Sequence, residues 1–150
     1  MALSPTVRIT RTVRFSAAHR YHTDALSAEE NARVYGKCNR PHGHGHDYRV
    51  DVAVDGPVDA VTGMVMNLAD LDRVLKQVVV EPLDHSFLNF DVEHFATTVP
   101  TCENIALYVA DVVEQPLEEF GIRLAGVRVW ETEDLFVDYE IPALASESVS

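Results

Sequence analysis

The sequence predicts an α+β domain in which two helices cover one face of a four-stranded antiparallel sheet. Alternating apolar and polar residues, the mark of half-buried strands, run over 7–19 and 42–55, and strand patterns recur over 124–132 and 135–141. Between these two pairs lie two segments whose apolar residues recur with helical spacing. The order strand, strand, helix, helix, strand, strand lacks the regular alternation of strands and helices that builds parallel sheets.

The length and composition fit one domain that spans residues 1–150. Of these 150 residues 47% are hydrophobic and 24% are charged, which is enough apolar material for a normal core without a disulfide. We find no internal linker and expect a loose tail over about 143–150. No apolar run approaches the roughly 20 residues that span a bilayer, and the N-terminus lacks the pattern of a signal peptide. We therefore expect a cytoplasmic protein with no membrane partner.

The first two predicted strands form an antiparallel pair with a long connection. In the first strand, His19 ends the inner, apolar face of 7–19. Residues 20–41 are polar and irregular, and within them the run that starts at Ser27 has the pattern of a capping box that opens a short helix. In the second strand, His42, His44 and His46 share one face with Tyr48 and three valines. Both strands thus carry histidine on the same side of the sheet.

The two predicted helices are each preceded by a residue that can cap them. Asn67 caps a helix that runs to about Val80, and Thr101 caps the second. Pro116 should kink or end the regular part of the second helix, because proline cannot donate a backbone hydrogen bond. A connector, 81–100, joins the two helices.

The charge and the cysteines narrow the classes of function. The chain has 12 basic and 24 acidic residues, so its formal net charge is −12. This charge argues against a nucleic-acid partner. Only Lys37 and Lys76 are lysines, and such an acidic, lysine-poor surface suggests adaptation to a saline cytoplasm. If the substrate is a phosphate ester, a few arginines near the site would have to neutralise its negative charge. Cys38 and Cys102 are too sparse to indicate a structural disulfide in a cytosolic chain.

The histidines predict a metal site. On a strand, residues two apart point the same way, so His44 and His46 can reach one ion together, and His19 on the neighbouring strand supplies a third imidazole. Three imidazoles without a fourth protein ligand leave a position open for substrate, as in catalytic zinc sites. Spacing alone equally allows His42 and His44 as the pair, and it also allows metal binding without catalysis.

Five segments together resemble the 6-pyruvoyl tetrahydropterin synthase family. They are Phe15–His19 (FSAAH), Gly36–Tyr48 (GKCNRPHGHGHDY), Gly63–Leu71 (GMVMNLADL), Pro82–His85 (PLDH) and Val129–Thr132 (VWET). They spread over most of the chain in the family's order. The resemblance implies the tunnelling fold, with subunits assembled into sheet-closed barrels, commonly hexamers.

The resemblance also implies the ligands and the base. In the family the cysteine precedes the first histidine of the zinc pair by six residues, so the implied Zn²⁺ ligands are His19, His44 and His46. His42 then has no ligand role. Cys38, as a thiolate near zinc, would be the general base.

Further roles in the implied reaction fall to the connector and the last strands. The reaction converts 7,8-dihydroneopterin triphosphate to 6-pyruvoyl tetrahydropterin with loss of triphosphate, a carbon–oxygen lyase reaction in which zinc acts as a Lewis acid. Asp84 would orient His85, which moves the second proton. Glu131 would accept the N–H groups of the pterin edge. Thr101 and Glu103 are candidates for the same pocket, although a helix cap and a first-turn acid explain them equally well.

Two other readings stay open. The sister activity that makes 6-carboxytetrahydropterin on the deazapurine route uses the same substrate, and its cysteine commonly lies closer to its zinc pair, a spacing that His42 and His44 mimic. A non-catalytic zinc- or pterin-binding module is the third reading. Cys102 stands where the family often has a second threonine of the pterin pocket, and a thiol donates hydrogen bonds poorly.

Overall fold

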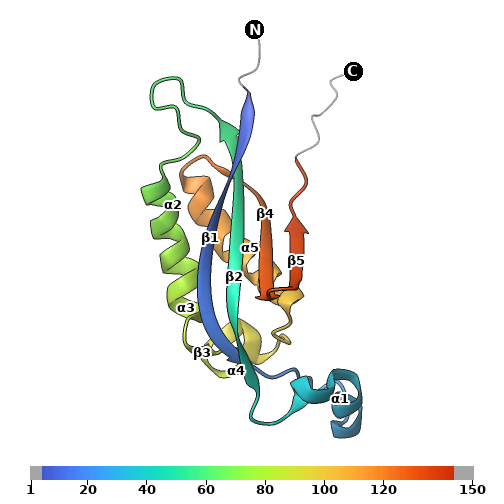
Figure 1. The fold of residues 1–150 in the computed structure, drawn as a ribbon. Helices are drawn as coiled ribbons and strands as arrows, with labels where there is room; N and C mark the ends of the chain where they lie inside the picture. Colours follow the sequence, from blue (N-terminus) through green and yellow to red (C-terminus); the bar gives the residue numbers. More distant parts are fainter. Residues whose placement is uncertain (1–4, 144–150) are drawn as a thin grey trace, which may run out of the picture.

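The computed structural model describes residues 5–143 and shows one open, five-stranded mixed sheet with its helices gathered mainly on one side (Figure 1). The predicted α+β class is confirmed, and so is the predicted placement of the main helices on one face of a single sheet. The sheet order is β3-β1-β2-β4-β5. The strands are β1 (Thr6–His19), β2 (His44–Pro57), β3 (Ser86–Phe87), β4 (Arg123–Thr132) and β5 (Leu135–Glu140). Except for Ala143, the predicted loose tail lies outside the described residues.

The predicted strand number, four antiparallel strands, is wrong by one. Strand β3 pairs with β1 in parallel, through Ala17 with Ser86 and Ala18 with Phe87. Two residues are too few to produce a recognisable alternation, so this strand was hidden in the connector. It lies at the edge of the sheet beside the end of β1, which brings the preceding residues of the connector to the same place.

The register of β1 and β2 brings the histidines together. These strands pair without a bulge from Thr6 opposite Pro57 to His19 opposite His44. Phe15 lies opposite Tyr48, and their rings stack with centroids 4.8 Å apart. A long, bulge-free pair fixes which residues face each other at its far end, because a slip of one residue would turn every side chain to the other face.

The first main helix is longer and less regular than predicted. Helix α2 (Leu68–Leu75) begins after Asn67, whose side chain accepts a hydrogen bond of 2.9 Å from the Ala69 N–H. The chain continues through a π-helical turn (Lys76–Val80) into the short α3 (Glu81–Leu83). It thus passes the predicted end and keeps Leu83 fully buried.

The second main helix, α5 (Cys102–Glu119), does not end at Pro116, although such an end was one of the two outcomes predicted there. It begins after Thr101, as predicted, and stays helical through Pro116 to Glu119. Proline removes one backbone donor, but Val113 and Leu117 on either side of it are fully buried. The burial of these two side chains stabilises the last turn of the helix and offsets the loss of one backbone hydrogen bond.

Four short helical segments complete the described chain. Helix α1 (Ala28–Tyr35) opens with the predicted capping box and lies at one end of the sheet (Figure 1). It leads into a 3-10 turn (Gly36–Asn39). Helix α4 (Leu88–Asp91) and a second 3-10 turn (Glu93–Ala96) follow β3. Among the described residues no helix is long and apolar enough to cross a membrane.

The core lies between the sheet and the main helices. Its fully buried residues include Val50, Val52 and Val54 of β2, Leu71 and Leu75 of α2, and Ile105 and Val109 of α5. The opposite face of the sheet carries bidentate ion pairs between Arg8 and Asp55 and between Arg128 and Asp138. In one chain this second face is open and polar.

Candidate metal centre and active site

Three imidazoles converge at the end of the β1–β2 pair. One ring nitrogen from each of His19, His44 and His46 lies within 4.8 Å of the others, and the Nε2 atoms of His19 and His44 are 3.2 Å apart. Two nitrogens bound tetrahedrally at about 2.0–2.1 Å from one zinc ion would be about 3.3 Å apart. The strand register creates this group, since His19 pairs with His44 and His46 follows on the same face.

The protonation of His19 and His46 suits a metal. His19 is fully buried, and burial, followed by the neighbouring His46 and His44, lowers its pKa to about 3. Burial also lowers the pKa of His46. His46 Nε2 is buried without a hydrogen-bond partner among the described residues. Because metals bind neutral imidazole and a buried polar atom needs a partner, the site fits a metal ion.

Tyr48 fixes the orientation of His19. Its hydroxyl lies 2.8 Å from His19 Nδ1, and the tyrosine is fully buried. With the Nδ1–H donated to the phenol oxygen, Nε2 keeps its lone pair for a metal. Sequence reasoning assigned Tyr48 only to the inner face, although its position two residues after His46 was the signal for this contact.

His42 does not join the group. It is exposed, and Gly43 after it has a φ of 66°, so the strand begins only at His44. A side chain at Gly43 would lie 2.7 Å from the His19 carbonyl oxygen, so the chain needs glycine there to pass close to β1. The turn breaks the alternation that made His42 and His44 an equally good pair by spacing.

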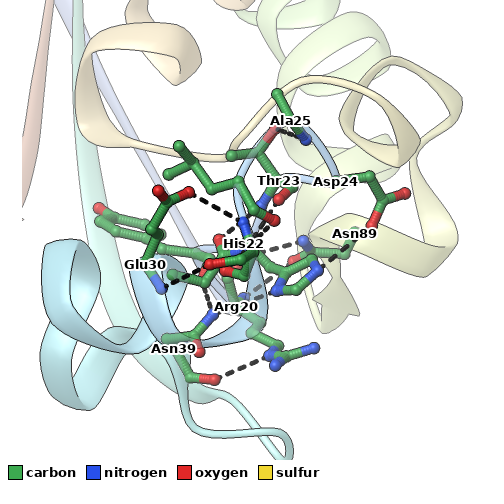
Figure 2. Close-up of polar contacts among 12 residues, drawn as sticks. Arg20, His22, Thr23, Asp24, Ala25, Glu30, Asn39 and Asn89 are labelled. Atoms are coloured by element: carbon green, nitrogen blue, oxygen red, sulfur yellow. Dashed lines mark hydrogen bonds and ion pairs between the residues drawn. The ribbon is translucent and has the colours of Figure 1, made fainter.

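The connection between His19 and Cys38 is held by amide side chains (Figure 2). Asn89 brackets Arg20, accepting from its N–H and donating to its carbonyl, both at 2.9 Å. Asn39 donates to the Tyr21 carbonyl at 2.7 Å, and the Tyr21 N–H donates to the Cys38 carbonyl at 2.8 Å. These bonds fold the segment back, so that Cys38 lies beside Tyr21.

Cys38 lies near a carboxylate. The thiol is half-buried, and burial, followed by the negative charge of Glu131, raises its pKa. Both effects favour the neutral thiol, and a nearby cation would favour the thiolate.

Glu131 is paired, as its predicted burial requires. One of its oxygens, Oε2, accepts from the Tyr21 hydroxyl at 3.2 Å. The other, Oε1, lies 3.6 Å from His46 Nε2. Its side chain is 13% exposed. Sequence reasoning missed Tyr21, because residues 20–41 have no regular pattern that predicts where a side chain points.

Asp84 and His85 form a dyad between α3 and β3. Asp84 Oδ2 lies 2.8 Å from His85 Nδ1, and its Oδ1 accepts from the Ser16 N–H at 2.8 Å. The N–H of Ser16, followed by His85, lowers the pKa of Asp84. His85 has a φ of 59°, a strained conformation held by a 2.6 Å hydrogen bond from its N–H to the Ser16 carbonyl.

This dyad borders the sheet where β1 and β2 meet β3. His85 lines a cavity with residues of both parities, Ser16, Ala18 and Gly45 on one side and Ala17 and His46 on the other. No hydrogen bond or ion pair among residues 5–143 joins Asp84 or His85 to Cys38. The structure thus brings the two members of the dyad together beside the end of β1.

The remaining residues of interest lie at the start of α5. Thr101 caps α5 by accepting from the Asn104 N–H at 3.1 Å, and Glu103 is exposed in the first turn. The Cys102 thiol is buried and donates to the Val129 carbonyl at 3.3 Å. Burial is the main cause that raises its pKa to about 12. It points toward β4 as a small core residue.

Comparisons with known proteins identify the family of the chain. The family model for 6-pyruvoyl tetrahydropterin synthase matches residues 8–142. The human 6-pyruvoyl tetrahydrobiopterin synthase is 46% identical over 133 residues, which cover 89% of this chain and 90% of that protein. The putative 6-carboxy-5,6,7,8-tetrahydropterin synthase of Archaeoglobus fulgidus is 35% identical over 114 residues, 76% of this chain and 88% of that protein.

A solved structure shows the same fold. The Caenorhabditis elegans 6-pyruvoyl tetrahydropterin synthase superposes with a TM-score of 0.89 at 39% identity, and the match covers 95% of this chain and 100% of that one. The match includes β1, β2 and β4, which carry the imidazoles and Glu131. The chain therefore belongs to the 6-pyruvoyl tetrahydropterin synthase family.

Proposed function

We propose that this chain is a zinc-dependent lyase that converts 7,8-dihydroneopterin triphosphate to 6-pyruvoyl tetrahydropterin with release of triphosphate. The observation that carries the proposal is the group of His19, His44 and His46 beside Glu131, with Cys38 near that carboxylate. The higher identity to the human pyruvoyl synthase, 46% against 35% for the Archaeoglobus carboxy enzyme, supports the pyruvoyl product. Two free thiols fit a reducing, cytoplasmic setting.

The proposed roles follow from the chemistry of each group. The reaction moves protons at two side-chain carbons and needs no external oxidant or reductant. Zn²⁺ bound by the three imidazoles would supply Lewis-acid stabilisation to the side-chain oxygens of the substrate. Cys38 removes a proton from a side-chain carbon, and its thiol can ionise once a cation offsets the charge of Glu131.

Glu131 anchors the pterin ring. Its partly exposed carboxylate can accept the paired N–H donors on the pterin edge. Thr101 and Glu103 remain candidates for contacts in this pocket through free backbone groups at the start of α5.

We further propose that the active site is completed by a second copy of the chain in a barrel-shaped oligomer, a hexamer by resemblance. Two observations support it: no hydrogen bond or ion pair among the described residues joins His85 to the Cys38 of its own chain, and the outer sheet face and the edge strand β5 are open. Leu135, Phe136 and Tyr139 of β5 are each at least 38% exposed, which suits pairing with another sheet edge.

Mixed oligomers test this arrangement. Cys38→Ala and His85→Ala proteins should each be inactive, whereas their co-expressed mixture should regain about a quarter of the wild-type turnover, because a random mixture forms intact sites with that frequency. Turnover of the purified mixture is the measurement. If Cys38 and His85 of the same chain act together, the mixture stays as inactive as its parents.

The product tests the function itself. Purified protein with stoichiometric Zn²⁺ is incubated with 7,8-dihydroneopterin triphosphate, and the products are identified by mass. The expected result is 6-pyruvoyl tetrahydropterin with one triphosphate released per turnover. Recovery of 6-carboxytetrahydropterin would favour the sister activity, and unchanged substrate would favour a binding module.

A further inference from the structure

We propose that Tyr21 is a positioning residue that holds Glu131 in place for the pterin and keeps its carboxylate from binding the metal. This inference rests on the proposed function for the role of Glu131 as the pterin anchor. It assigns to Tyr21 a task that neither the histidine spacing nor the family motifs assign.

Tyr21 is held from several sides. Its hydroxyl donates to Glu131 Oε2 at 3.2 Å. Its ring packs against His19 with centroids 4.8 Å apart and against Tyr35 at 5.7 Å. Its backbone is tied in both directions, by its N–H to Cys38 and by its carbonyl to Asn39. A phenol fixed in this way can act as a rigid tether for a carboxylate.

Glu131 needs such a tether because it lies within reach of the metal. Its free oxygen, Oε1, is 3.6 Å from His46 Nε2. Two ligand atoms bound tetrahedrally at about 2.0–2.2 Å from one zinc ion would be about 3.4 Å apart. Oε1 therefore lies at about this separation from His46 Nε2. Glu131 is not in the group of His19, His44 and His46, whose ligand atoms all lie within 4.8 Å of one another, so its carboxylate would have to rotate to join the metal.

Two arrangements of the carboxylate thus compete. Three imidazoles and one carboxylate would fill a tetrahedral zinc ion and leave no position for substrate, whereas catalytic sites keep one position open. Carboxylate oxygen is a common zinc ligand, so the metal attracts Glu131. The hydrogen bond from Tyr21 to the opposite oxygen restrains rotation toward the metal and leaves the carboxylate available to the pterin edge.

Tyr21→Phe tests the proposal, because it removes the hydroxyl and keeps the ring on His19. The visible absorption of the Co²⁺-loaded protein reports the ligands of the metal directly. We expect the Tyr21→Phe spectrum to differ from that of the wild type, and Co²⁺ loss to a chelator to slow by about tenfold as a carboxylate joins the metal. We also expect KM for 7,8-dihydroneopterin triphosphate to rise by about tenfold, because the anchor is displaced.

Two further variants identify the cause. In the double variant Tyr21→Phe with Glu131→Gln, the spectrum should return to that of Glu131→Gln alone, because the amide is a poor zinc ligand. Tyr35→Phe is the matched control, since Tyr35 packs on the same ring without a hydrogen bond to Glu131 among the described residues; its Co²⁺ spectrum and KM should match the wild type.

A Tyr21→Phe spectrum and chelation rate equal to those of the wild type would overturn the proposal. So would a spectral change that persists when residue 131 is glutamine. The spectroscopy needs no substrate, so it separates this inference from the proposed function. If the wild type forms no pterin product but the Co²⁺ spectra change as expected, the proposed function fails while the control of Glu131 by Tyr21 stands.

Discussion

Replacing Cys38 with alanine is expected to lower turnover by about 1,000-fold while the bound metal and the fold remain, because general-base catalysis typically contributes 10²–10⁴-fold. The side chain is half-buried in a short 3-10 turn and contributes little to the core. The measurement combines steady-state turnover with metal analysis and thermal unfolding. Cys38→Ser should be nearly as inactive, since a hydroxyl of similar size ionises far less readily than a thiol.

Cys102→Ala is the control for this prediction. Cys102 is 3% exposed, donates to the Val129 carbonyl and has a pKa raised to about 12, so its thiol is unreactive at neutral pH. We expect this variant to keep turnover within about tenfold of the wild type, with a loss of unfolding free energy of about 1 kcal/mol for the small cavity and the lost hydrogen bond. A Cys38→Ala protein with activity in that same range would remove Cys38 as the base.

The parts of the fold that were predictable are those with long, regular patterns. Thirteen or more alternating residues defined β1 and β2, and the caps Asn67 and Thr101 marked both main helices. Strand β3 could not be predicted, since two residues contain no period. The passage of α5 through Pro116 depends on the burial of Val113 and Leu117, a tertiary effect that outweighs a local preference.

The candidate site was predictable where it is built on strands. Parity and pairing alone indicated that His19, His44 and His46 could meet, and the structure brings these three rings together. The exclusion of His42 depends on the positive φ of Gly43, which a strand pattern does not reveal. Contacts made by irregular segments were beyond sequence reasoning.

Two such contacts change the interpretation of the site. Tyr21 reaches Glu131 from a segment without periodicity. The dyad of Asp84 and His85 lies at the sheet edge, because β3, which follows it, pairs with β1. Motifs therefore identified residues of the right chemistry, but the contacts among these residues had to come from the structure.

Replacing His44 with alanine is expected to weaken metal binding by at least about 100-fold, because even residues that only support a ligand cost 10–100-fold. His44 is the suitable choice among the three imidazoles. It is half-buried at the start of β2, whereas His19 is fully buried and its removal would also leave a cavity beside Tyr48. The measurement is the metal content after dialysis against a competing chelator, together with turnover, which should be lost with the metal.

The matched control for this experiment is His42→Ala, two residues earlier in the same repeat. His42 is exposed and precedes the turn at Gly43, so its variant should retain one metal ion per chain and nearly full turnover. Unchanged metal content in His44→Ala would exclude His44 as a ligand. Loss of metal in both variants would mean that metal binding rearranges the turn at Gly43 and recruits His42 together with His44. The spacing of the repeat permits this pair as well as His44 with His46, and only the backbone conformation at Gly43 distinguishes the two pairs.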